Sequence, residues 1–148
     1  MKFIPLVTLI ISFCSISLYA GQQQLKKGSV VVAVESLRSD SGTVRVSLYS
    51  SKEGFPMKSE KALQTVVASI KEGRARAAFH DMPYGTYAAA VLHDENGNGR
   101  MDFSWMMFPR EGFGASNIKE KRMLPPPFGD SKFLLDSEQR MLKVVVHY

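Results

Sequence analysis

Residues 43–50 read TVRVSLYS, in which Val44, Val46 and Leu48 alternate with more polar residues. An alternation with a period of two predicts a β-strand that has one apolar face and one solvent-facing face. The same pattern recurs along the chain, and no stretch has the periodicity of an amphipathic helix of ordinary length. The sequence therefore predicts an all-β fold.

Outward from this strand, the same reasoning predicts six further strands, at residues 29–37, 64–70, 74–79, 86–93, 132–136 and 141–148. The turn Asp40-Ser41-Gly42 predicts a hairpin between the first two strands. The turn Lys71-Glu72-Gly73 predicts a second hairpin, with Gly73 at a positive φ. Seven short strands are typical of an antiparallel β-sandwich, with a partly closed barrel as the alternative, and one helical turn is expected near residues 58–62.

The length of 148 residues, with 45% apolar and 22% charged residues, corresponds to one folded domain. Residues 1–20 have Lys2, an apolar run and a small residue at the end, which predicts a secretory signal peptide. A polar lead at 21–28 and a single domain at 29–148 follow. We expect an exported protein, periplasmic or extracellular, without a membrane span after cleavage and without disulfides, because Cys14 is the only cysteine.

The formal net charge is +5, and the basic residues are scattered along the chain. A scattered distribution does not favour nucleic-acid binding, which needs a basic patch or stripe. We expect a monomer that binds no nucleic acid.

Directly after the strand at 86–93 the chain reads DENGNGRMD, residues 94–102. Oxygen-bearing side chains at alternate positions followed by glycine match the opening of a calcium-binding loop, D-x-[DN]-x-[DN]-G. The predicted Ca²⁺ ligands are Asp94, Asn96, Asn98, the backbone carbonyl of Arg100, Asp102 and, as a further candidate, Glu111.

The twelfth position of this loop is Trp105, where an EF-hand has glutamate, so the loop is not an EF-hand. Two asparagines in place of aspartates lower the ligand charge, and we expect a dissociation constant on the order of 10⁻⁵ to 10⁻³ M. The alternative is a hydrophilic turn without an ion, since Asn, Asp and Gly are common in turns for backbone reasons alone.

A long segment at 104–131 follows, and its apolar content predicts an ordered loop that packs on the sandwich. Its sequence WMMF at 105–108 is interpreted either as core packing or as an exposed contact patch. If the calcium loop orders this segment, the segment offers a surface for a protein, a glycan or another envelope ligand.

Two other functions stay open. His93, Glu111 and Ser116 are the residue types of a base, an orienting carboxylate and a nucleophile, as a hydrolase-like enzyme requires. No nucleophile-elbow motif supports an enzyme, so a non-enzymatic role is favoured. A purely structural envelope protein without an ion is the remaining alternative.

Residues 81–99, DMPYGTYAAAVLHDENGNG, resemble the proline, glycine, tyrosine, strand and acidic-loop run of prealbumin-like β-sandwich modules. Together with PREGFGASN at 109–117 and PPPF at 125–128, the chain resembles a bacterial family of small exported proteins, the domain-of-unknown-function family 2141. The resemblance implies a seven-stranded prealbumin-like or immunoglobulin-like sandwich and no established activity. The matching positions are His93, Asp94, Asn96, Asn98, Gly99, Asp102, Pro109, Glu111, Gly112, Gly114, Ser116 and Asn117.

Overall fold

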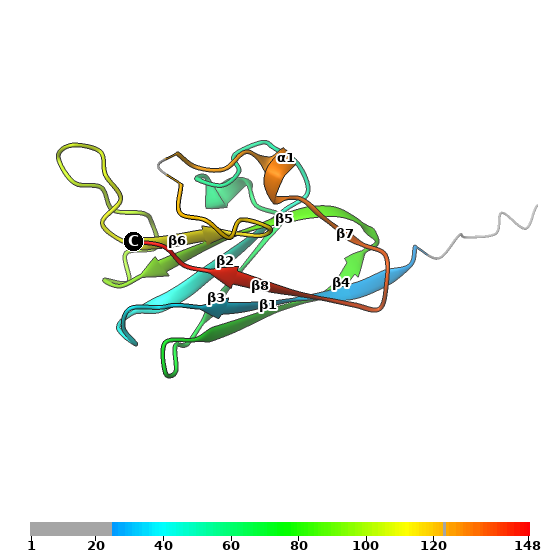
Figure 1. Ribbon diagram of the computed structural model, residues 1–148. Coiled ribbons are helices and arrows are strands. Elements are labelled where there is room, and N and C mark those ends of the chain that lie inside the picture. The colour runs from blue at the N-terminus through cyan, green and yellow to red at the C-terminus, as the bar shows by residue number, and fades with distance from the viewer. Residues whose placement is uncertain (1–24, 123) are drawn as a thin grey trace, which may run out of the picture.

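A computed structural model describes residues 25–122 and 124–148, and this part of the chain forms eight strands in two layers (Figure 1). The strands are β1 (Lys27–Glu35), β2 (Thr43–Tyr49), β3 (Gln64–Ala68), β4 (Ala75–Pro83), β5 (Gly85–Asp94), β6 (Gly112–Ala115), β7 (Phe133–Leu135) and β8 (Gln139–Val145). A 3-10 turn, η1 (Ser59–Lys61), and a single helical turn, α1 (Phe128–Ser131), lie in the connections. The predicted signal peptide at 1–20 lies outside the described residues, and within them no helix is long and apolar enough to cross a membrane.

One sheet has the order β4-β1-β8, and the other has the order β3-β2-β5-β6, with β7 paired to the start of β5. Inward side chains of both sheets form one core, in which Val32, Val46 and Phe79 are completely buried. The all-β, two-sheet prediction is therefore confirmed.

Three details of the predicted topology are wrong. There is an eighth strand, β6, inside the segment predicted as a loop, because its sequence GFGA has too few side chains to show an alternation. The pairs β1–β2 and β3–β4 are not hairpins, since the members of each pair belong to different sheets. The sandwich is not purely antiparallel either, because β1 and β8 run parallel in the β4-β1-β8 sheet.

The two predicted turns instead carry the chain from one sheet to the other. The Asp40 carboxylate accepts the backbone N–H of Glu72 at 2.9 Å and that of Gly73 at 2.8 Å, so the two crossings are tied together. Gly73 has a φ of 68°, as predicted. The predicted helical turn is also confirmed, as η1.

At one edge the two sheets are joined. Phe113 of β6 and His147, just after β8, exchange two backbone hydrogen bonds of 3.0 and 2.9 Å. The glycines of β6 make this approach possible, since a Cβ at Gly114 would lie 2.6 Å from the carbonyl oxygen of Val145. The C-terminus consequently lies beside β6 (Figure 1).

The outward face of β2 is not exposed to solvent as the alternation predicted. Ser47 and Tyr49 are buried, and Arg45 is half-buried. Connecting segments cover this face of the β3-β2-β5-β6 sheet, and this cover positions the site described next.

Candidate functional site

The polar loop, residues 94–102, begins where β5 ends, and its first side chain is held inside the protein. Asp94 is 1% exposed, and its two carboxylate oxygens accept the backbone N–H groups of Asn98 at 3.0 Å and Gly99 at 2.8 Å. Gly99 has a φ of 81°, a left-handed conformation that glycine adopts without steric cost. The loop is therefore closed by hydrogen bonds of its own.

Asn96, Asn98 and Asp102 come together in the polar loop. The side-chain nitrogen of Asn96 lies 2.6 Å from Asp102 Oδ2, and that of Asn98 lies 3.0 Å from Oδ1. The side-chain oxygens of the two asparagines accept the backbone N–H groups of Asn98 and Arg100, each at 3.0 Å. Nitrogen donors, and not oxygen ligands, are thus directed at the Asp102 carboxylate.

Glu111 joins both ends of the polar loop from β6's side of the sheet. Its side chain is 4% exposed, Oε1 accepts the N–H of Glu95 at 3.0 Å, and Oε2 accepts the N–H of Asp102 at 3.1 Å. Within the described ranges 25–122 and 124–148, no three His, Cys, Asp or Glu side chains are grouped as a metal site. Glu111 acts in this structure as a clamp on the backbone.

His93 is completely buried at the end of β5, and its hydrogen bonds specify a tautomer. Nε2 lies 2.8 Å from the carbonyl oxygen of Ser41, which can only accept, so Nε2 carries the proton. The Tyr148 hydroxyl accepts the backbone N–H of Arg38 at 3.0 Å and donates to His93 Nδ1 at 2.6 Å. A neutral imidazole therefore satisfies both hydrogen bonds of His93, and Glu95 Oε1 lies 4.0 Å from Nδ1.

Arg38 extends this network to the polar loop. Its guanidinium lies over the Tyr148 ring, 4.4 Å from the centroid, and hydrogen-bonds the Glu95 carboxylate. That hydrogen bond is the main reason why the pKa of Glu95 is lowered and the pKa of Arg38 is raised. Burial raises the pKa of Tyr148. Arg38 therefore fixes the side chain of Glu95, and Glu111 accepts the backbone N–H of the same residue.

Ser116 lies in a different part of the sheet from His93. Its hydroxyl donates to the carbonyl oxygen of Ser131 at 2.6 Å and accepts the N–H of Ala89 at 2.9 Å. Ala89 precedes His93 by four positions on β5, which is a distance of about 13 Å along a strand. The structure does not bring His93, Glu111 and Ser116 to one point, and each has other partners.

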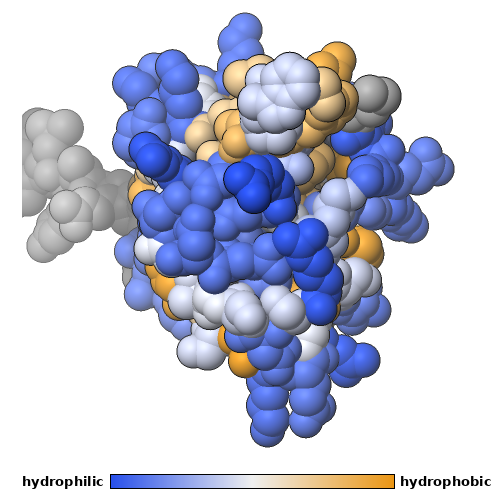
Figure 2. Space-filling view, turned by 90° about the vertical axis from the view of Figure 1, so that its left-hand side faces the viewer, coloured by the Kyte–Doolittle hydropathy of each residue, from blue (hydrophilic) through white to orange (hydrophobic). Residues whose placement is uncertain are grey.

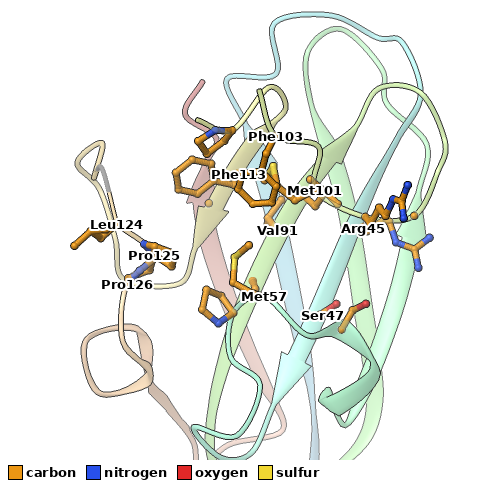
Figure 3. Close-up of a pocket in the computed structure, with 18 of the residues that line it drawn as sticks. Arg45, Ser47, Met57, Val91, Met101, Phe103, Phe113, Leu124, Pro125 and Pro126 are labelled. Carbon is orange, nitrogen blue, oxygen red and sulfur yellow. The ribbon is translucent and has the colours of Figure 1, made fainter. Parts of the chain in front are cut away.

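A pocket of about 310 Å³ lies on the outer face of the β3-β2-β5-β6 sheet (Figure 3). Its floor consists of outward residues of β2, β5 and β6, because the register places Ser47 opposite Ala90 and Leu92 opposite Phe113 on that face. Three connections form the walls: residues 56–60, residues 99–109 and the prolines at 125–126 with Leu124. The lining is mostly apolar, and Arg45 lies at the end opposite to Leu124 (Figure 3).

The tip of the wall at 99–109 is exposed. Trp105 is 91% exposed, and Met106, Met107 and Phe108 are exposed with it. Figure 2, which looks onto this end of the molecule, shows apolar residues gathered at its top. Of the two interpretations of WMMF, the structure supports the exposed patch. Met107 of this patch also lines the pocket, so the mouth of the pocket is apolar.

Comparison with protein-family models gives a match. The sequence model of a bacterial family, described as "Uncharacterized protein conserved in bacteria (DUF2141)", matches residues 32–143. The chain belongs to this family. The match runs from β1 to β8 and so includes the polar loop, Glu111 and the pocket walls of this DUF2141 chain. Searches of curated proteins and of solved structures found no match.

The pocket of this DUF2141 chain was missed by the sequence reasoning, although two signals pointed to it. Tyr49 and Leu92 are large side chains on strand faces that the alternation assigns to solvent. Connections rich in proline and methionine, such as 56–57 and 124–127, also supply apolar side chains, which favour packing on the surface of a sheet. Together these signals indicate a covered outer face.

Proposed function

We propose that this chain is an exported, non-enzymatic binding module that takes an apolar small molecule into the pocket on the outer face of the β3-β2-β5-β6 sheet. The observation that carries the proposal is the pocket itself. Its volume is at the lower end of the range for small-molecule sites, roughly 300 to 1,000 Å³, and such sites are mostly apolar with a few polar groups. A rigid sheet as floor also gives a preformed shape.

The polar loop has a supporting role in this proposal. Asp94 closes the loop and Glu111 clamps its ends, so the wall at 99–109 starts from a fixed base on the sheet. The wall is closed at its other end by the backbone hydrogen bond from Arg110 to the Asp102 carbonyl, 2.9 Å. Hydrogen bonds to residues next to the sheet thus fix both ends of this pocket wall.

Calcium binding by the polar loop is part of the same proposal. What supports it is the convergence of Asn96 and Asn98 on the Asp102 carboxylate, because rotation of each amide by half a turn would direct its oxygen to the same point. The rotation would break the hydrogen bonds that the two oxygens now accept from Asn98 and Arg100. The ion must outweigh that loss, which agrees with the modest affinity expected from the sequence.

Export is proposed on the sequence of residues 1–20 alone. Non-enzymatic function is proposed because the hydrogen bonds of His93, Glu111 and Ser116 assign each side chain a structural partner. Neither proposal depends on the pocket.

Binding of the neutral, apolar dye Nile red tests the proposed function. We expect a rise in dye fluorescence with the purified protein and a large loss of that rise in Ala90→Phe, which fills the pocket from its floor. Leu134→Phe is the control, because it adds the same side chain at an exposed site on β7, away from the pocket. Ala90→Leu is a milder second variant, and thermal unfolding verifies that each variant is folded. Equal dye binding by the wild type and folded Ala90 variants would overturn the proposal.

A further inference from the structure

Arg45 is the one charged residue of the pocket floor. It lies in the middle of β2, directly opposite Val67 on β3 and Leu92 on β5, so apolar side chains flank it on both sides. Its guanidinium is also near the polar loop, since a Cβ at Gly99 would lie 3.8 Å from its Cζ and Nη1. The side chain is half-buried by these neighbours.

The guanidinium of Arg45 has neither a hydrogen bond nor an ion pair with any residue in the ranges 25–122 and 124–148, although its backbone is paired within the sheet. Arg38 pairs with Glu95, and Arg122 pairs with Asp130 at 3.0 Å. The other described arginines without such a partner are exposed, so water solvates them: Arg74, Arg76, Arg100, Arg110 and Arg140. A charged group held against an apolar surface loses part of its hydration, which costs free energy. An anionic partner that forms hydrogen bonds with the group offsets this cost. A guanidinium suits a carboxylate in particular, because its planar fork can donate two parallel hydrogen bonds.

The other charged residues that line the pocket are Arg100 on the loop wall and Glu60 at η1, and both are exposed. With Arg45 the pocket has two guanidinium groups and one carboxylate, which leaves an excess of one positive charge. At the end opposite to Arg45 lie Leu124, Pro125 and Pro126 (Figure 3). The pocket therefore has a cationic side chain at one end and apolar side chains at the other.

We propose that the natural ligand class is an anionic amphiphile, whose carboxylate pairs with Arg45 and whose apolar chain extends toward Leu124 at the other end of the pocket. The inference rests on the proposed function, because it names the class of molecule that the same pocket takes. Ion pairing at Arg45 supplies selectivity between head groups, and contact with the apolar walls supplies the rest of the affinity.

Displacement of Nile red by two ligands that differ only in the head group tests the inference. We expect decanoate to compete about tenfold more strongly than decanol, which is the size of effect that a hydrogen bond to a charged group contributes. In Arg45→Met the two ligands should compete equally, mainly through weaker binding of decanoate. Arg76→Met on β4 is the matched control for charge, because Arg76 is exposed and does not line this pocket, and it should keep the preference.

Equal competition by decanoate and decanol against the wild type would overturn the inference while leaving the proposed function in place. A preference for decanoate that persists in Arg45→Met would also overturn it. Failure of decanoate to displace bound Nile red would overturn it as well. If Nile red itself does not bind, the proposed function fails.

Discussion

Two buried carboxylates, Asp94 and Glu111, fix the segment that follows β5. Each accepts two backbone N–H groups, and neither makes an ion pair within the part of the chain that the structure describes. A buried carboxylate without such donors would be costly, on the order of several kcal/mol. These four hydrogen bonds specify the path of the polar loop.

The pair of Arg38 and Glu95 predicts a pH dependence of stability. The pKa of Glu95 is lowered from its ordinary value of 4.5, mainly by the hydrogen bond from Arg38, so the folded state favours the ionised carboxylate. The stabilisation is therefore complete above about pH 4.5 and is lost as the pH falls through the lowered pKa. Because Arg38 is half exposed, solvent screening limits it to about 0.5 to 1 kcal/mol.

Urea unfolding at pH 7 and pH 3 measures this effect. The unfolding free energy of Glu95→Gln should fall below that of the wild type at pH 7, and the difference should shrink at pH 3. Glu138→Gln, at an exposed glutamate, is the control. A difference that stays constant with pH would contradict the assigned role of Glu95.

The sequence predicted the members of this cluster but not their roles. The spacing of Asp94, Asn96, Asn98 and Asp102 indicated that oxygen-bearing side chains would gather, and in the structure these residues lie in one loop. The role of Glu111 as a backbone clamp was unpredictable, because its donors are main-chain N–H groups whose positions depend on the path of the chain. His93 was predicted as a candidate base, and only its partners in the structure reveal its structural hydrogen bonds and its tautomer.

Among the elements, β6 has glycines, Gly112 and Gly114, where its inner face approaches the end of the chain closely. Gly114→Ala should lower the free energy of unfolding by about 1 to 3 kcal/mol, because the new Cβ would meet the Val145 carbonyl at 2.6 Å. Gly129→Ala in α1 is the matched control, since a Cβ there meets nothing within 4 Å. Urea unfolding of both variants measures the difference, and equal stabilities would show that β8 does not depend on this close approach.

If the polar loop binds calcium, the ion should raise the unfolding temperature of the protein. At a hundredfold excess over its dissociation constant, an ion that binds only the folded protein adds about 2.7 kcal/mol, which raises the unfolding temperature by several degrees. Asp102→Asn should abolish the rise and change the unfolding temperature in EDTA little, because the asparagine oxygen still accepts from Asn96 and Asn98. Asp136→Asn, at an exposed site, should keep the rise.

Thermal unfolding in EDTA and in millimolar calcium measures these shifts. Superimposable curves for the wild type would mean that the polar loop is only a turn closed by its own hydrogen bonds. A rise that survives in Asp102→Asn would place the ion elsewhere.

Strands with a regular alternation were predictable from the sequence, and the connections between them were not. The pattern of Val44, Val46 and Leu48 identified β2, and the turn residues located both chain reversals. A turn sequence does not show whether the chain returns to the same sheet or crosses to the other. That choice is made by tertiary contacts such as the hydrogen bonds of Asp40 to the turn at 72–73.

At the scale of the whole molecule, the sandwich has one core and one covered outer face. The core was predictable because burial on one side of each strand leaves a period-two signal. The pocket was not, because its walls come from three irregular connections that lie far apart in the sequence and meet only in the fold. The proposed binding site therefore lies where the sequence pattern is least informative.

Binding of an apolar molecule on the outer face of the β3-β2-β5-β6 sheet can be observed residue by residue. The measurement is a series of amide NMR spectra of the labelled protein, recorded during titration with the neutral ligand decanol. We predict that the signals of Arg45, Ala90 and Gly114 shift in a saturable manner while those of β4 and β1 stay in place. The absence of shifts up to the solubility limit of decanol, or the largest shifts on the β4-β1-β8 sheet, would contradict binding on this face.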